Sequence, residues 1–163
     1  MDGDTPFVET FVQIPGNALR LPLDRFRREL ARNGGLAEAV LEYTRNLLRL
    51  IVQSSACNLA HSLPQRCARM LLVCSDSVSR ETFRVTQEFL AELLAVRRAS
   101  VTVIAGKLKA AGLLQYRNGV VTIRDRAGLE KVSCECYRVI RTQLDLDQRM
   151  RTDRPPVVGR RRP

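Results

Sequence analysis

Residues 85–114 read VTQEFLAELLAVRRASVTVIAGKLKAAGLL and carry the clearest structural pattern of the chain. It holds two segments of helical apolar periodicity, about nine and about fifteen residues long, which are separated by a short turn at Ala95. Thr86 can cap the first helix through its hydroxyl, and Gly112 stands where a helix commonly ends. Two short helices joined by a tight turn have the proportions of a helix-turn-helix, whose second helix enters the major groove of DNA.

The start of the second helix carries polar side chains outside its apolar stripe. We predict that the residues that meet the bases are Arg97, Arg98, Ser100 and Thr102. Arg98 is the strongest of these candidates, because an arginine can donate to guanine O6 and N7 together, whereas Arg97 lies at the turn. The alternative interpretation is that these charges merely solvate an exposed helix face.

Other residues of the same motif suit the sugar–phosphate backbone. Thr86 and Gln87 offer backbone N–H groups and an amide at the first helix start, and Lys107 and Lys109 lie farther along the second helix. Contacts to phosphates position a protein on DNA without reading sequence. These four residues are therefore predicted to contribute affinity.

A β-hairpin is predicted directly after the second helix. The run LLQYRNGVVTIRD places Asn118-Gly119 between two β-rich segments, and this dipeptide is a strong signal for a two-residue hairpin turn. Such a hairpin is the wing of a winged helix-turn-helix. It carries Arg117 and Arg124, and Arg117 joins the predicted DNA-binding residues.

A long helix is predicted upstream, over residues 36–62. Apolar and small residues recur there at alternating steps of four and three, which gives a seam formed by Leu36, Val40, Tyr43, Leu47, Leu50, Ser54, Cys57 and His61. A seam of this kind favours pairing with another helix, as in a dimer. Packing within its own domain is the alternative, and polar residues weaken the seam near its end.

Four further segments complete the predicted organisation. Residues 7–14 alternate like a strand, and a short helix follows with Asp24 as its cap. Ser62 and Gln65 form a capping box that begins a helix running through Cys74, and a polar link covers residues 75–81. A helix capped by Asp125 is predicted over residues 126–150, before a basic, proline-rich tail at 149–163 that is expected to be disordered.

The composition restricts the classes of function. The chain has 163 residues, 45% hydrophobic residues and a formal net charge of +10, which favours a polyanionic partner. No apolar run approaches the ~20 residues that span a bilayer, and no secretory leader is recognisable, so we expect a cytoplasmic, nucleoid-associated protein with no membrane partner. An odd number of cysteines suggests reduced, packed thiols. A single histidine and no glycine-rich phosphate loop argue against an enzyme.

These residues resemble a known family. The runs RCARMLLVCSDSV, TQEFLAELLAVRRASVTVIAGKLKAAGLLQYRNGVVTIRDRAGLE and CECY are similar to the C-terminal half of bacterial Crp/Fnr transcription regulators. QIPGNALRLPLDRFRREL resembles the last strand and following helix of that family's cyclic-nucleotide-binding β-roll. The resemblance implies a homodimer on a two-fold symmetric operator, with recognition helices ~34 Å apart.

The sequence also departs from the family pattern. Most of the β-roll has no counterpart, so the resemblance implies an N-terminally shortened member that does not bind a cyclic nucleotide. The family's glutamate base reader falls at Ala99 and its second arginine reader at Val103, so the operator does not carry over. The five cysteines show no iron–sulfur spacing, and we expect no cofactor, no metal and no site at His61.

The sequence therefore predicts a mainly α fold with a small β wing. The predicted parts are a β-roll remnant (1–35), a long dimerisation helix (36–62), a winged helix-turn-helix domain (63–148) and the tail (149–163). The predicted function is sequence-specific regulation of transcription by a dimer bound to double-stranded DNA. The alternative is an interaction protein that forms heterodimers with a full-length relative, and an unstable fragment is a third possibility. RNA binding ranks low, because stacking aromatics are few.

Overall fold

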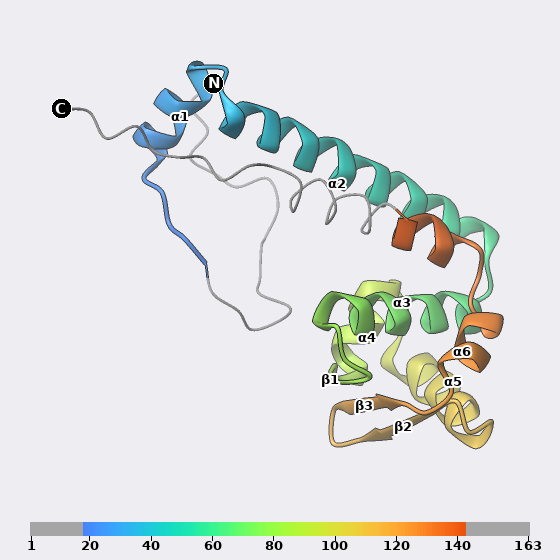
Figure 1. Cartoon of the computed structure of the whole chain (residues 1–163). Coiled ribbons are helices and arrows are strands. Elements are labelled where there is room, and N and C mark those ends of the chain that lie inside the picture. Colours follow the sequence, from blue (N-terminus) through green and yellow to red (C-terminus); the bar gives the residue numbers. More distant parts are fainter. Residues whose placement is uncertain (1–17, 143–163) are drawn as a thin grey trace. The chain divides into compact units, whose positions relative to one another are not determined.

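The computed structural model describes residues 18–142 (Figure 1). The predicted strand at 7–14, the tail at 149–163 and the end of the predicted 126–150 helix lie outside these residues. The chain divides into two units between Leu41 and Glu42. In the described part, no helix is long and apolar enough to cross a membrane.

The first unit contains a short helix, α1 (Leu23–Ala31), and the start of α2 (Gly35–Ala60). Pro22 occupies the N-cap position of α1, so the prediction that Asp24 caps this helix is wrong. Asp24 lies in the first turn instead, where a carboxylate suits the helix dipole, and its Oδ2 pairs with Arg28 Nη2 at 3.2 Å. Asn33, at φ 47°, ends the helical conformation before α2 begins.

The helix α2 leaves large apolar side chains in solvent. Beyond residue 41 they include Tyr43, Leu47, Leu48, Leu50, Ile51, Val52 and Leu59. Cys57, near the C-terminal end, is by contrast completely buried. A helix that exposes this much apolar surface favours a further packing partner.

The helix α3 (Leu63–Val78) begins as predicted and ends later. Ser62 and Gln65 form the expected capping box, with Pro64 in the first turn. The helix continues into the predicted polar link (75–81) as far as Val78, and Ser79, left-handed at φ 53°, ends it. Ser75 explains the extension, because it faces the protein interior and its Oγ donates to the Arg80 carbonyl at 2.9 Å.

The helix-turn-helix consists of α4 (Gln87–Leu94) and α5 (Arg98–Ala110). Thr86 caps α4 as predicted, since its Oγ1 accepts from the Phe89 N–H at 3.1 Å. Ala95 adopts the left-handed conformation at φ 52°, which ends α4 and turns the chain. The alanine stands at the position in the turn that glycine often occupies.

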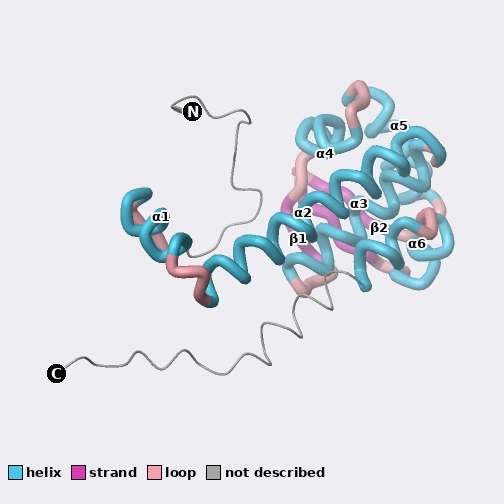
Figure 2. Tube along the Cα trace, turned by 90° about the horizontal axis from the view of Figure 1, so that it is seen from above, coloured by secondary structure: helices cyan, strands magenta, loops and turns pink. Residues whose placement is uncertain are grey.

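A three-stranded antiparallel sheet forms the wing, in the order β1 (Thr82–Arg84), β3 (Val120–Ile123), β2 (Leu114–Arg117). The β2–β3 turn confirms the predicted hairpin: Asn118 and Gly119 have φ values of 51° and 73°, as a type I′ turn requires. β1 packs against α3 and β2 against α5, and Figure 2 shows the strands in magenta. The pairing of β1 with β3 was not predicted.

One hydrophobic core joins the helices to the sheet. Its most deeply buried large side chains are Leu71, Leu72, Leu90, Leu94, Leu129, Val101 and Val121. Leu90 and Leu94 come from α4 and Val101 from α5, so the core fixes the crossing of the two helices. The fold class predicted from the sequence, mainly α with a small β wing, is confirmed.

The helix that follows the wing is interrupted at Ser133, where a continuous helix was predicted. Asp125 caps α6 (Arg126–Val132) as expected, with Oδ1 accepting from the Gly128 N–H at 2.8 Å, but Ser133 is extended (ψ 159°) and ends the helix. A new helical segment starts at residue 136. The prediction of one helix from residue 126 onward is therefore wrong, because the break lets Tyr137 reach the core.

Arg126 ties this segment to α3. Its guanidinium pairs with Asp76, with Glu81 at 3.1 Å and with Glu130 at 3.1 Å, and it donates to the Tyr137 hydroxyl at 2.7 Å. Burial alone would lower the pKa of Arg126, but the bond and charge of Asp76 raise it overall. This network secures the position of α6 beside α3.

Alkaline pH is expected to destabilise the fold through the thiol of Cys67. Burial raises its pKa to about 12, whereas a thiol in the unfolded chain ionises near pH ~8.5. Between these two pKa values the folded chain keeps a proton that the unfolded chain loses. The stability that is present below the unfolded pKa is therefore lost progressively as the pH rises toward the folded pKa. The free energy of unfolding should fall by ~1 kcal/mol per pH unit for this thiol. Urea titrations under reducing conditions should show a shallower alkaline decline for Cys67→Ala; equal slopes would contradict this expectation.

Candidate nucleic-acid interface

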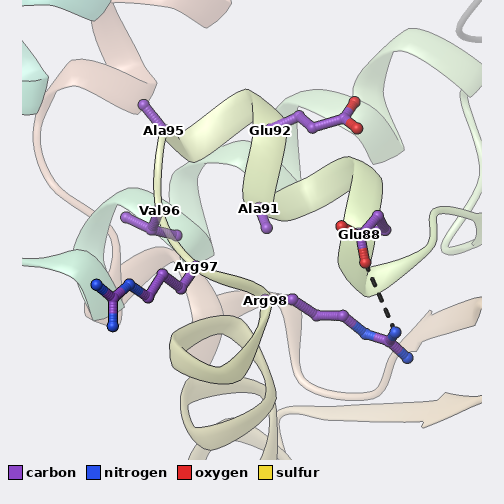
Figure 3. Close-up of a pocket in the computed structure, with 7 residues that line it drawn as sticks. All are labelled: Glu88, Ala91, Glu92, Ala95, Val96, Arg97 and Arg98. Carbon is purple, nitrogen blue, oxygen red and sulfur yellow. Dashed lines mark ion pairs between the residues drawn. The ribbon is translucent and has the colours of Figure 1, made fainter.

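Arg97 and Arg98 lie at the start of α5, and both are exposed. The turn at Ala95 places them beside α4, where a hollow of about 600 Å³ is lined by Glu88, Ala91, Glu92, Ala95, Val96, Arg97 and Arg98. Figure 3 shows that the two arginines point in opposite directions from the chain. They therefore have different surroundings although they are adjacent in sequence.

Arg98 is held beside an acidic residue of α4. Its Nη1 lies 3.6 Å from Glu88 Oε2, and both side chains are about two-thirds exposed (Figure 3). An exposed ion pair of this length is weak and readily exchanged. The Arg98 guanidinium therefore stays accessible to solvent beside Glu88.

The helix-turn-helix and the wing meet at a second hollow, of about 340 Å³. It is lined by Thr86, Gln87, Arg98, Tyr116, Asn118 and Gly119. Three of the predicted DNA-binding residues, Thr86, Gln87 and Arg98, are therefore neighbours of the wing turn. The Tyr116 hydroxyl donates to the Val85 carbonyl at 2.5 Å, which joins the wing to the chain just before α4.

Thr102 and Gln87 form a direct link between α5 and α4. The Thr102 hydroxyl lies 2.7 Å from Gln87 Oε1 and 3.1 Å from the Arg98 carbonyl. Accepting from Thr102 leaves the Gln87 amide nitrogen available as a donor to a phosphate or a base. Thr102 is exposed and Ser100 half-buried. The sequence pattern does not indicate the Gln87–Thr102 bond, because the two residues are 15 positions apart on different helices.

The remaining residues predicted to contact DNA do not line either hollow. Lys107 and Lys109 are exposed in the last turn of α5, where their charge suits the helix dipole. Arg117 is exposed at the end of β2, next to the wing turn, and Arg124 is exposed after β3 with its Nη2 2.5 Å from Gln115 Oε1. The basic residues thus extend from α5 to the wing.

Glu88→Gln is expected to strengthen binding to double-stranded DNA by up to ~5-fold. The substitution removes an exposed ion pair worth up to ~1 kcal/mol and takes a negative charge from the vicinity of the phosphates. Fluorescence anisotropy at fixed salt measures the change. Glu92→Gln is the matched control, since Glu92 lines the same hollow without a pair to Arg98, and it should have the smaller effect. Weaker binding by Glu88→Gln would show that Glu88 positions Arg98 for DNA.

A second group of chemically active side chains was not recognised from the sequence. Cys57, His61, Cys134 and Cys136 each place one donor atom within 4.8 Å of the others. Two signals could have pointed to it: the Cys-x₃-His spacing, which puts both residues on one helix face, and the Cys-x-Cys pair. The two pairs lie more than 70 residues apart, so neither spacing indicates that they meet in the fold.

The comparisons with known proteins concern the same region. Residues 65–132 match the family model of the Crp-like helix-turn-helix domain. No curated protein matches the chain by sequence.

Two solved structures resemble the fold. One, from Eubacterium rectale, is assigned to the Crp/Fnr family of transcriptional regulators; it is 21% identical over 68% of this chain, with a TM-score of 0.56. The other, a CRP-family transcriptional regulator from Thermus thermophilus, is 26% identical over 69% of this chain, with a TM-score of 0.50. The matches cover 51% and 55% of those chains, so this chain spans about half of their length. Residues 65–132 therefore form a Crp-like helix-turn-helix domain.

Proposed function

We propose that the protein is a sequence-specific regulator of transcription that binds double-stranded DNA through α5 and the wing. The observation that carries this proposal is the exposed arginine Arg98 at the start of α5, beside the hollow shared with the wing turn. The Crp-like domain and the net charge of +10 support it. The proposed place of action is the cytoplasm, on the nucleoid.

The proposed roles divide the interface into two groups. Arg98 reads a guanine, with Ser100 and Thr102 beside it, because residues at the start of a recognition helix meet base edges. Thr86, Gln87, Lys107 and Arg117 contact the backbone. Arg97, which the sequence places among the base contacts, is assigned to the backbone as well, because its side chain points away from Arg98 (Figure 3). Contacts of the second kind add salt-dependent affinity, since each neutralised phosphate releases counterions.

We propose that two copies pair through α2 to bind a two-fold symmetric site. The predicted seam does not serve this purpose over its whole length, because Cys57 and His61 face the chain's own segment after α6. A second stripe of α2 is exposed instead, at Leu48, Val52 and Leu59, which are 59–92% exposed. These residues follow the three-and-four spacing of a coiled coil, with Ser55 at the intervening position.

The alternative candidate uses the same stripe to pair with a full-length relative. The exposed apolar surface of α2 favours either partner. Sedimentation analysis of the purified chain separates them: a homodimer at micromolar concentration supports the first, whereas a monomer that associates only with an added relative supports the second. An insoluble chain would favour the fragment interpretation.

DNA selection from random oligonucleotides tests the proposed function. The expected product is a site with two half-sites one helical turn apart, each containing a guanine that Arg98 reads. We further propose that binding needs no cyclic nucleotide. Added cyclic AMP should then leave the Kd unchanged, and a Kd more than ~10-fold lower with cyclic AMP would contradict this part of the proposal.

A further inference from the structure

Four potential metal ligands meet at the end of α2. Cys57 lies in the last turn of α2, and His61 directly follows the helix, with its N–H donating to the Cys57 carbonyl at 3.1 Å. Cys134 lies in the link after α6, and Cys136 is the first residue of the next helical segment. The helix break at Ser133 brings the second pair to this position. All four residues belong to the unit that contains the DNA-binding domain.

The distances fit a single tetrahedral ion. Cys57 Sγ lies 3.5 Å from Cys134 Sγ, and Cys136 Sγ lies 3.6 Å from His61 Nδ1. A tetrahedral Zn²⁺ with Zn–S bonds of ~2.3 Å separates its sulfur ligands by ~3.7 Å. An iron–sulfur cluster holds its ligands farther apart, because several iron atoms lie between them. The spacing therefore favours a mononuclear centre.

The three thiols are buried together and apart from the main core. Cys57, Cys134 and Cys136 are at most 3% exposed and form their own cluster, separate from the hydrophobic core around Leu71 and Leu94. Small thiols that contact one another bury less apolar area than leucine or isoleucine would at the same positions. Packing alone does not account for three of them at one point.

Neighbouring side chains orient the ligands as in metal sites. His61 Nε2 hydrogen-bonds Glu135 Oε1 at 3.0 Å, which leaves Nδ1 directed at the thiols. A histidine ligand commonly uses its second nitrogen in this way toward a carboxylate. Gln53 Nε2 donates to Cys136 Sγ at 3.0 Å, a bond that suits a thiolate. Both contacts would hold His61 and Cys136 in place as ligands of a bound ion.

We propose that Cys57, His61, Cys134 and Cys136 bind one Zn²⁺ ion in an S₃N site. The protein fills all four positions, which is the arrangement of structural rather than catalytic zinc. The site joins the end of α2 to the segment that delivers Tyr137 and Ile140 to the protein interior. The ion would thus fasten the long helix to the DNA-binding domain. This inference does not rest on the proposed function.

Metal analysis of the full chain tests the site. Protein prepared with zinc under reducing conditions, then freed of loose metal, should hold about one ion per chain. Cys134→Ser should lose it, whereas Cys74→Ser, which alters a cysteine outside the cluster, should keep it. Cobalt in place of zinc should give the intense thiolate-to-cobalt absorption and the visible bands of a tetrahedral site. Wild-type chain that takes up neither zinc nor cobalt would overturn the proposal.

Two further variants separate loss of a ligand from loss of the fold. His61→Cys retains four ligand atoms and should still bind zinc, and Glu135→Gln should weaken affinity by at least ~10-fold while leaving the ligands intact. Unchanged affinity in Cys134→Ser, with its fold verified by circular dichroism, would contradict the assignment. A Cys57–Cys134 disulfide in a chain that binds no metal after reduction would instead show a redox pair and overturn the zinc site.

Discussion

Arg98→Ala is expected to reduce affinity for the selected DNA site by ~10- to 100-fold. A bidentate arginine–guanine contact contributes ~1–3 kcal/mol of discrimination, and Arg98 is the exposed arginine whose surroundings include both α4 and the wing turn. The fold should be unaffected, because the side chain is about two-thirds exposed and its pair to Glu88 is weak. Competition anisotropy with matched and mutated sites measures the change.

Three variants distinguish a base contact by Arg98 from general electrostatic attraction to DNA. Arg98→Ala should relax preference at one base pair in each half-site and leave affinity for unrelated DNA nearly unchanged. Lys107→Ala should weaken binding to all sequences and lower the salt slope by ~1. Lys131→Ala, on α6, is a control for loss of one positive charge. Equal losses on specific and unrelated DNA would show that Arg98 contacts a phosphate.

Leu48→Glu is expected to convert the proposed dimer into a monomer and to weaken binding to the selected DNA site by at least ~100-fold. Leu48 lies in the exposed stripe of α2. In a dimer, Leu48→Glu would bury one carboxylate from each copy at the interface, and burying unpaired charges costs free energy. Loss of the second half-site removes the gain from bivalent binding, which is worth ~10²- to 10⁴-fold. Analytical ultracentrifugation and anisotropy measure the two effects.

Leu47→Glu provides the matched comparison for this variant. Leu47 is the adjacent leucine, is also partly exposed, and belongs to the seam that ends in Cys57 and His61. It should leave the dimer largely intact. Dimer loss in Leu47→Glu with a stable dimer in Leu48→Glu would place the interface on the originally predicted seam.

The local signals in the sequence predicted the wing and the starts of α3, α4 and α6. Thr86 and Asp125 cap their helices, and Asn118-Gly119 forms the turn, because each of these features depends on the backbone within a few residues. Ala95 shows the same dependence, since its left-handed conformation follows from the short link between two helices. For this reason the helix-turn-helix could be predicted from the sequence.

The features that were missed depend on contacts between distant residues. α3 continues past Cys74 to Val78, where Asp76 pairs with Arg126 and accepts from the Tyr137 hydroxyl at 2.8 Å. The chain breaks at Ser133, close to the point where Tyr137 enters the core. Periodicity cannot show either event, because both the continuous and the broken helix satisfy the same apolar pattern. The cysteine–histidine cluster was missed for the same reason: its halves are brought together by tertiary structure alone.

Hydroxyl-radical footprinting of the wild-type chain on its selected site tests whether two copies place α5 in successive major grooves of one DNA site. We expect two protected segments one helical turn apart, related by a two-fold axis, with methylation interference at the guanine that Arg98 is proposed to read. A single protected segment, or uniform protection with no preferred sequence, would contradict it.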